Sequence, residues 1–458
     1  MLQTIVALAT PAGRSGIGVV RLSGPESVAF AQRLASGDDY DPAPRHASLK
    51  TLTDLETGEP IVEAILTYFR APNSFTGEDV IEISCHGSPI LLRQIIDACL
   101  KLGARLAEPG EFTLRALANG RMNLAEAEAV RDLIDARTSA SARLAVRQLK
   151  GEFSNRLQPI KDRLLDAIVV LESSLEFVED DLPATQTERL GENLEQMAGE
   201  IDEMAATFKA GRLLREGLKV TLAGRPNVGK SSLFNALLGT DRAIVTEIAG
   251  TTRDQINESF VVHGVPVSLM DTAGLRETSD TVEIIGVERS RRAMADADLV
   301  IVVIDASEPV SDEDIEVLES VKELPHVVAI NKIDKIARVD ETLDQVRKSI
   351  QNGSGEIVPA SATTGTGIDL LKHAIVHPFV SHESTDTGFL VTDARHHDLL
   401  LRAKDEIDSS IALLNQNASE ELTLIGLHNA LRYLGQITGE TTTEDMLTRI
   451  FSTFCIGK

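Results

Sequence analysis

A glycine-rich segment, GRPNVGKS at Gly224–Ser231, constrains the fold of this chain more than any other feature. It fits the pattern GxxxxGK[ST], follows the apolar run LKVTLAG and precedes the helix-like run SSLFNALLG. Glycines let main-chain N–H groups curl around phosphates, and a helix N-terminus adds the positive end of its dipole. The segment therefore predicts a phosphate-binding loop between a strand and a helix, and hence an α/β domain with a parallel sheet.

Further blocks follow in the order that a GTP-binding domain requires. DTAG at Asp271–Gly274 ends an expected strand, where the Asp can hold the Mg²⁺ shell and the Gly N–H can meet the γ-phosphate. NKID at Asn331–Asp334 ends another strand. A carboxylate at Asp334 accepts two hydrogen bonds from the guanine N1–H and 2-amino groups, a pair that adenine lacks. Ser361 and Ala362 are expected to meet guanine O6.

The hydrolytic group is less evident from these motifs. Thr252, in the GTTRD block, is expected to close onto Mg²⁺ and the γ-phosphate when GTP is bound. Leu275 stands where Ras-like enzymes place a water-orienting Gln, so either the domain is a slow switch or another group does the chemistry. Asn227 resembles the Asn that marks potassium-dependent GTPases, whose K⁺ neutralises charge. The acidic residues after DTAG either orient water or form a solvated face; they are Glu277, Asp280 and Glu283.

Changes of pattern divide the 458 residues into four segments. Short β-like runs alternate with Gly, Pro and one helical run at first, and strand, loop and helix alternate in the middle. Helical spacing flanks this middle block on both sides, so we expect an all-α domain with a P-loop α/β domain inserted in it. The expected segments are 1–118 for an N-terminal α/β domain, 119–212 and 385–458 for the helical domain, and 216–378 for the inserted domain.

Two apolar stripes mark the first helical segment. Core packing is the expected role of both, and a face that binds a partner is the alternative. The first stripe is Leu157, Ile160, Leu164, Ile168 and Leu171, and the second, with heptad spacing, is Leu190, Leu194, Met197, Ile201, Met204 and Phe208.

Composition limits the partners and the compartment. The chain carries 45 Lys and Arg against 70 Asp and Glu, a net charge of −25, which disfavours independent binding of nucleic acid or anionic membranes. Its 3 cysteines form no CxxC pair, and no apolar run is long enough for a membrane span. The first residues lack the basic region of a signal peptide. We therefore expect a cytoplasmic protein.

Several blocks together carry a resemblance to a known family. They are TPAGRSGIGVVRLSG, PNSFTGEDVIEISCHG and EPGEFTLRA before residue 119, GRPNVGKSS, GTTRD and DTAGLRE in the middle, and the terminal FCIGK. In this order they resemble the MnmE (TrmE) family of bacterial tRNA modification GTPases over essentially the whole chain.

The resemblance implies a specific activity. Members act with a flavin-dependent partner, MnmG (GidA), and install an aminomethyl-type group on carbon 5 of the wobble uridine of certain tRNAs. The one-carbon unit comes from a tetrahydrofolate derivative (5-formyl- or methylene-tetrahydrofolate), and FAD and NADH enter through the partner. The implied assembly is a homodimer, dimerised by the folate-binding N-terminal domain, that forms a heterotetramer with MnmG. The acidic balance of this chain predicts that the partner holds most of the tRNA.

The resemblance also implies roles for individual residues. Glu283 matches the catalytic acid and Cys455 a functional thiol, although a small packing residue is the alternative for this Cys. Mg²⁺ would bind Ser231 and Thr252, and K⁺ would bind Asn227, Thr246, Ile248 and Thr251. Folate would contact Arg21, Glu82, Arg121 and Lys458, with Arg121 standing where some relatives have Lys. The predicted GTP site comprises Asn227, Val228, Gly229, Lys230, Ser231, Ser232, Thr246, Glu247, Ile248, Ala249, Gly250, Thr251, Thr252, Asp271, Thr272, Ala273, Gly274, Asn331, Lys332, Asp334, Ser361, Ala362 and Thr363.

Two other interpretations belong to different classes of protein. A GTP-switched ribosome-assembly factor would be expected to carry a basic RNA-binding domain, and none is visible in the sequence. A scaffold whose GTP-binding domains merely dimerise would hydrolyse GTP equally well without Glu283. Neither explains the folate-like N-terminal blocks or FCIGK. Cys85 and His86 resemble a nucleophile pair, but neighbours in a strand point to opposite faces, so a structural role is expected.

Overall fold

The computed structural model describes residues 3–35, 40–176, 184–239, 258–270, 297–337, 339–349, 355–379, 388–416, 418–440 and 444–457. The chain divides into two compact units, one of 1–134, 146–195 and 405–458 and the other of 135–145 and 196–404. Within the described ranges, no helix is both long enough and apolar enough to cross a membrane. Each unit is described by itself.

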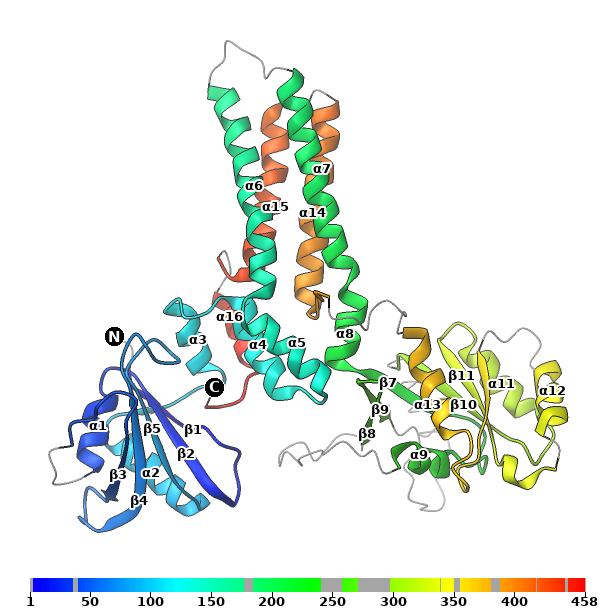
Figure 1. Cartoon of the computed structure of the whole chain (residues 1–458), viewed down its shortest axis with the longest axis horizontal. Helices are drawn as coiled ribbons and strands as arrows, with labels where there is room; N and C mark the ends of the chain where they lie inside the picture. Colours follow the sequence, from blue (N-terminus) through cyan, green and yellow to red (C-terminus); the bar gives the residue numbers. More distant parts are fainter. Residues whose placement is uncertain are drawn as a thin grey trace. The chain divides into compact units, whose positions relative to one another are not determined.

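The first unit begins with a six-stranded mixed sheet in the order β3-β4-β5-β2-β1-β6 (Figure 1). Two helices pack on one face, because alternate strand residues such as Leu66 and Ile83 are apolar and join one core with helix residues such as Ile95. On β4 the neighbouring residue Ile65 is exposed, so the other face is open at this strand, whereas Ile5 and Ala7 of β1 are buried on it together with Phe112. The elements are β1 (Ile5–Leu8), β2 (Ser15–Ser23), α1 (Ser27–Leu34), β3 (Ala47–Thr53), β4 (Pro60–Phe69), β5 (Val80–Gly87), α2 (Pro89–Lys101) and β6 (Arg105–Leu106).

Helices make up the rest of this unit. α15 packs against α6, and every residue of the stripe from Leu157 to Leu171 on α6 is buried, which confirms its core role. The helices wholly in this unit are α3 (Glu111–Ala118), α6 (Glu152–Glu176), α15 (Glu420–Thr438) and α16 (Glu444–Phe451); α4 (Leu124–Asp135) and α5 (Ser139–Leu149) cross its boundary, as do α7 (Ala184–Ala206) and α14 (Ala394–Asn415).

The predicted heptad seam is continuous in sequence but not in the fold. Its members from Leu190 to Met204 are buried on α7, whereas Phe208 is half-buried and begins a new helix, α8 (Phe208–Glu216). The break falls at Thr207, whose hydroxyl donates to the Met204 carbonyl and accepts from the Val391 N–H at 2.9 Å. A side chain that bonds the local main chain in this way competes with the helix, so the seam ends one member early, at Met204.

The second unit contains a sheet in the order β12-β11-β10-β7-β9-β8, parallel except for β8. Alternate residues of β10 point into two separate cores, Ile301 with α9 and α13 and Val302 with α11, so helices cover both faces. A hairpin turn at His263–Gly264 joins β8 to β9. The elements are β7 (Leu218–Ala223), α9 (Lys230–Leu238), β8 (Glu258–Val262), β9 (Val265–Met270), β10 (Leu299–Asp305), α11 (Asp312–Val321), β11 (His326–Asn331), the 3₁₀ turn η1 (Ile333–Lys335), α12 (Val339–Ser349), β12 (Glu356–Pro359), α13 (Ile368–Val376) and the turn η2 (His377–Phe379).

A buried arginine joins α3 to the first sheet. Arg115 is 5% exposed and pairs with Glu78 at 3.0 Å and with Glu111 at 2.9 Å, and it donates to the Gln3 carbonyl. Burial makes each of these carboxylates dependent on its partner, because an unpaired charge inside a protein is costly. The network therefore ties the segment before β1, the segment before β5 and α3 together.

We predict that Arg115→Ala lowers the free energy of unfolding by about 3–5 kcal/mol, because Glu78 and Glu111 lose a buried partner. Arg93→Ala is the matched control, since Arg93 pairs with Asp97 on an exposed helix face and the change should stay within about 0.5 kcal/mol. Urea unfolding followed by circular dichroism measures both. Equal effects of the two substitutions would contradict the structural role of Arg115.

Candidate functional site: a nucleotide-binding loop cluster and an N-terminal carboxylate–arginine pair

The predicted phosphate loop has the geometry that its sequence requires. It connects β7 to α9, and Gly229, at the N-cap of α9, has a φ of 94°. A Cβ at this position would lie 2.4 Å from the side-chain amide nitrogen of Asn331, so only glycine fits. The Lys230 ammonium donates to the carbonyls of Gly224 and Arg225 at 2.6 and 2.8 Å, and burial lowers its pKa.

The two segments predicted to contact the guanine base, Asn331–Asp334 and Ser361–Thr363, meet the phosphate loop at the carboxyl ends of the parallel strands. Asn331, 1% exposed, donates to the Val228 carbonyl at 3.0 Å and accepts from the Ala362 N–H at 3.2 Å. Ser361, fully buried, donates to a carboxylate oxygen of Asp334 at 2.6 Å. This bond orients the carboxylate that is expected to read guanine.

The structure therefore brings three of the predicted loops together, those at Asn227–Ser232, Asn331–Asp334 and Ser361–Thr363. Lys332 joins two of them, because its ammonium donates to the Asn227 carbonyl at 2.7 Å. The remaining predicted nucleotide, metal and catalytic positions of this site lie outside the described residues; they are Thr246, Glu247, Ile248, Ala249, Gly250, Thr251, Thr252, Asp271, Thr272, Ala273, Gly274 and Glu283.

A second cluster lies on the first sheet. Arg21 on β2 and Glu82 on β5 are cross-strand partners, and two guanidinium nitrogens of Arg21 contact Glu82 Oε1 at 2.9 and 2.7 Å. Arg21 also donates to the Gly457 carbonyl at 3.3 Å. The structure thus places the C-terminal segment, 436 residues away in sequence, beside this pair. Arg21 and Glu82 remain partly exposed, so a ligand can reach them.

Glycine and aromatic residues hold the C-terminal segment in this place. Gly457 has a φ of 97°, and a Cβ there would lie 2.3 Å from the Leu8 carbonyl. Phe451 and Phe454 are buried against Leu124 in a small apolar core. Cys455 between them and the chain end is exposed, so the alternative role as a buried packing residue is wrong. Lys458 lies outside the described residues.

The other N-terminal predictions have different outcomes. Arg121 is exposed, and a Cβ on Gly77 would come within 3.2 Å of its Cγ, so it borders the loop before β5. In the part of the chain that the structure describes, no hydrogen bond or ion pair joins Arg121 to Arg21 or Glu82. Cys85 is buried and His86 is exposed, as expected for neighbours in a strand, and burial raises the pKa of the Cys85 thiol.

Sequence analysis missed two aromatic residues of this cluster. The Arg21 guanidinium lies 5.8 Å from the ring centres of both Phe75 and Phe112. Both belong to sequence blocks that carry the family resemblance, SFTGEDV and GEFTLRA, but an isolated Phe gives no signal of its own. Their rings add a flat apolar surface beside the charged pair.

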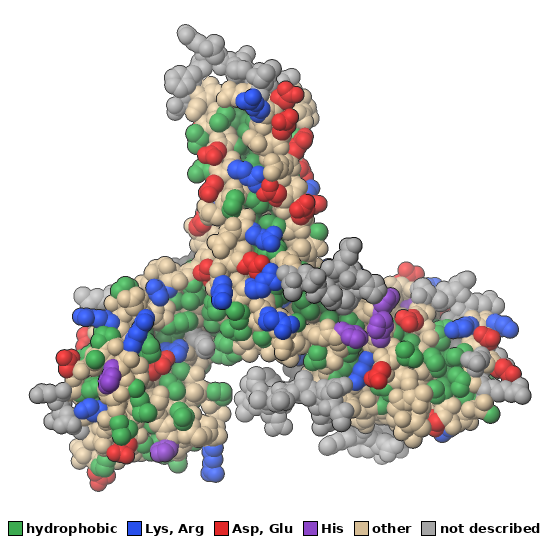
Figure 2. All heavy atoms as spheres, viewed as in Figure 1, with side chains coloured by type: hydrophobic (Ala, Val, Ile, Leu, Met, Phe, Trp, Pro, Cys, Tyr) green, Lys and Arg blue, Asp and Glu red, His purple; other side chains and the backbone are tan. Residues whose placement is uncertain are grey.

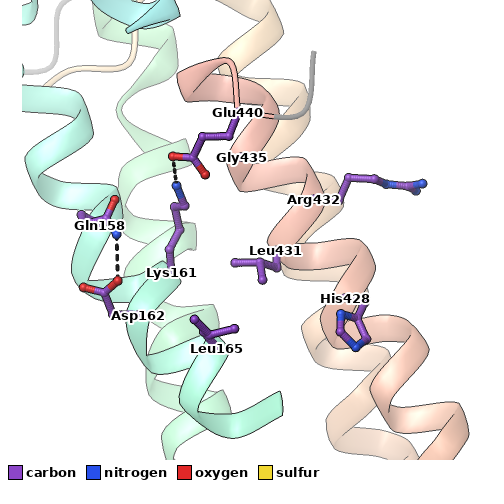
Figure 3. A pocket seen from close by; sticks show the side chains of 9 residues that line it. All are labelled: Gln158, Lys161, Asp162, Leu165, His428, Leu431, Arg432, Gly435 and Glu440. Atoms are coloured by element: carbon purple, nitrogen blue, oxygen red, sulfur yellow. Dashed lines mark hydrogen bonds and ion pairs between the residues drawn. The ribbon is translucent and has the colours of Figure 1, made fainter. Parts of the chain in front are cut away.

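A separate pocket lies between α6 and α15 and contains none of the predicted residues. It has a volume of about 380 Å³, with Leu165 and Leu431 among its lining (Figure 3). Lys161, which is buried, pairs with Glu440 at its edge, and Gln158 donates to Asp162 at 2.7 Å. The Lys161 ammonium therefore already has an acidic partner in the pocket wall.

The parallel sheet, the glycine loop and the NKID–Ser361 contact define the second unit as a P-loop GTP-binding domain of the GTPase class. Two family models cover most of the chain, "GTP-binding protein TrmE N-terminus" at residues 4–121 and "MnmE helical domain" at residues 124–455.

Relatives named tRNA modification GTPase MnmE match the full length. The one from Aquifex aeolicus is 43% identical over 100% of both chains, and the one from Koribacter versatilis is 45% identical over 100% of this chain and 99% of its own. Among solved structures, the G domain of T. maritima FeoB is 33% identical over 35% of this chain and 97% of its own, with a TM-score of 0.26. The chain belongs to the MnmE (TrmE) family of tRNA modification GTPases.

We predict that Ser361→Ala raises the dissociation constant for GDP about fivefold, because the Asp334 carboxylate loses the hydrogen bond that orients it. Ser320→Ala is the control, since the Ser320 hydroxyl donates only to a carbonyl of its own exposed helix. Titration with a fluorescent GDP analogue measures both constants. An unchanged affinity in Ser361→Ala would show that Asp334 needs no such support.

Proposed function

We propose that this chain is a potassium-dependent GTPase whose cycle drives modification of carbon 5 of the wobble uridine in certain tRNAs. The partner supplies flavin chemistry, and a tetrahydrofolate derivative supplies the one-carbon unit. The proposal rests above all on the contact of Asn331 with the phosphate loop and with Ala362, in a chain that matches its family from end to end. Within it, 216–378 hydrolyses GTP, 1–118 binds folate and dimerises, and 119–212 with 385–458 forms the helical domain.

Asn227 is the residue of the phosphate loop best suited to hold K⁺. It is exposed, and its φ of 63° is unusual for a residue with a side chain, so its position is imposed by the surrounding loop. K⁺ there would neutralise charge that develops between the phosphates during hydrolysis. Thr246, Ile248 and Thr251 would complete the K⁺ site. Ser231 and Thr252 would hold Mg²⁺, and Glu283 would orient the attacking water.

Arg21 and Glu82 support the folate part of the proposal. A pterin ring offers adjacent N–H donors, which the Glu82 carboxylate can accept, and arginine suits the negatively charged tail. Arg121 and Lys458 are the further residues proposed for folate contact. Cys455 is exposed on the segment whose Gly457 carbonyl meets Arg21, which supports a functional role for this thiol.

The open face of the first sheet supports the homodimer. Leu49 and Ile65 are cross-strand partners on β3 and β4, and their side chains are 64% and 45% exposed. Ile17 on β2 is 66% exposed. Large apolar side chains gathered on one open sheet face mark a surface that another protein surface covers. A second copy of the N-terminal domain is the proposed occupant.

The net charge of the chain supports the proposal that the partner binds most of the tRNA. The net charge is −25, and acidic as well as basic side chains lie along the helices on the face that Figure 2 shows. Phosphate binding depends on clustered Lys and Arg. A flavin-dependent MnmG protein, bound in a heterotetramer with this homodimer in the cytoplasm, would therefore hold most of the tRNA and bring FAD and NADH.

We predict that GTP hydrolysis falls at least tenfold when Na⁺ replaces K⁺ at fixed ionic strength, because the smaller ion does not match the ligand shell that Asn227 helps to form. Phosphate release at saturating GTP measures the rate. Asn227→Ala should lower the rate in K⁺ to the level in Na⁺, while GDP still binds. Equal wild-type rates in both salts would exclude the proposed role of Asn227.

We also predict that cells lacking this chain lose aminomethyl-type wobble uridines, measured by mass analysis of tRNA nucleosides. The intact gene should restore them. Glu283→Ala should fail because hydrolysis stops, whereas Glu82→Gln should fail although the purified variant still hydrolyses GTP. Persistence of these nucleosides in the deleted strain would exclude the proposed substrate.

A further inference from the structure

We infer that Asp305, the last residue of β10, is a positioning residue that locks Lys332 of the NKID block against the phosphate loop. None of the sequence motifs includes this residue. Its effect on nucleotide binding passes through Lys332 and does not require contact with the nucleotide. The inference rests on the GTP binding of the proposed function and adds a residue to the same site.

The first observation is the environment of the Asp305 carboxylate. Asp305 is 4% exposed, and Oδ2 accepts from the Lys332 ammonium at 2.5 Å. Oδ1 accepts from the Ser307 N–H at 2.9 Å and from its hydroxyl at 2.6 Å. Burial alone would raise the pKa of this carboxyl, but the bonds from Lys332 and Ser307 outweigh burial, so its pKa is lowered. The group is therefore a fixed negative charge at neutral pH.

The second observation is the strained backbone that Lys332 connects. Lys332 has a φ of 64° and Asn227 a φ of 63°, both in the left-handed region that residues with side chains rarely occupy. The Lys332 ammonium donates to Asp305 and to the Asn227 carbonyl at 2.7 Å. One ammonium thus links a buried carboxylate to an exposed residue of the phosphate loop. Such backbone conformations persist only where the surroundings impose them.

The third observation is that the segment after β10 contacts the phosphate loop at a second point. Asp314 on α11 is 1% exposed and forms an ion pair with Arg225 of that loop at 3.2 Å. Asp314 also closes the capping box of α11 with Ser311, which fixes its position. The segment from Asp305 to Asp314 therefore provides a rigid support on which Asp305 can hold Lys332.

Removal of the Asp305 charge should loosen the two loops together. The Lys332 ammonium would keep only neutral oxygens as partners, in a place where solvent cannot fully replace the lost charge. The phosphate loop and the loop at Asn331–Asp334 would then be less ordered in the free protein. They would have to become ordered when the nucleotide binds, and this ordering costs free energy. Affinity for GDP and GTP should fall, and the fold of the sheet should be retained.

The test is a double-mutant cycle with Asp305→Asn and Lys332→Met, measured by titration with a fluorescent GDP analogue in Na⁺. Asp305→Asn alone should raise the dissociation constant about tenfold. In the Lys332→Met background, the same substitution should change it at most about twofold, because the residue through which Asp305 acts is already missing. Additive effects, or an unchanged affinity in the single variant, would overturn the inference.

Asp298→Asn is the matched control. Asp298 directly precedes β10 and pairs with Arg212 at 3.0 Å, at the end of the strand about 20 Å from Asp305. It should leave GDP affinity unchanged, and urea unfolding of both variants checks that the sheet is intact. If Asp298→Asn weakens GDP binding as much as Asp305→Asn does, the effect is general destabilisation and the inference fails.

A second readout separates this inference from the potassium proposal. If Asn227 binds K⁺, Asp305→Asn should also raise the K⁺ concentration for half-maximal hydrolysis several-fold, because the Asn227 carbonyl loses its anchored partner. GDP binding in Na⁺ does not depend on that proposal. Wild-type protein that fails to bind GDP would refute the proposed function, whereas normal GDP binding by Asp305→Asn would refute the inference alone.

Discussion

The buried side-chain amide of Asn331 is the contact on which the nucleotide site depends. It donates to Val228 of the phosphate loop and accepts from Ala362 of the loop after β12, so a single side chain sets the spacing of three loops. The parallel sheet makes this possible, because the carboxyl ends of β7, β11 and β12 all reach the same edge. The same contact requires a glycine at position 229, because a Cβ there would displace the side-chain amide of Asn331.

Charged side chains stabilise the loops only where burial gives them a fixed partner. Lys332 and Asp305 are such a pair, and Arg225 and Asp314 form another next to the phosphate loop. In the first unit, Arg115 with Glu78 and Glu111 has the same character, whereas Arg93 with Asp97 is exposed and contributes little. Because burial decides which ion pairs stabilise the structure, a count of charged residues in the sequence could not identify those pairs.

Sequence reasoning was strongest where one motif carries its own local geometry. GRPNVGKS predicted a strand, a loop and a helix, and β7 and α9 flank it as expected. The core stripe of α6 was equally local and was confirmed. The heptad seam was predicted too long, because its end is decided by a bond between Thr207 and Val391, which are distant in sequence.

By itself, the sequence determined the class of domain, the order of the nucleotide-binding loops and the family, since these depend on residue types at short spacings. Only the tertiary structure decided that the Gly457 carbonyl meets Arg21 beside Glu82, that Phe75 and Phe112 flank that arginine, and that Asp305 holds Lys332. Each of these contacts joins segments that are far apart along the chain. Their formation depends on the packing of whole sheets and helices, and no local pattern encodes that packing.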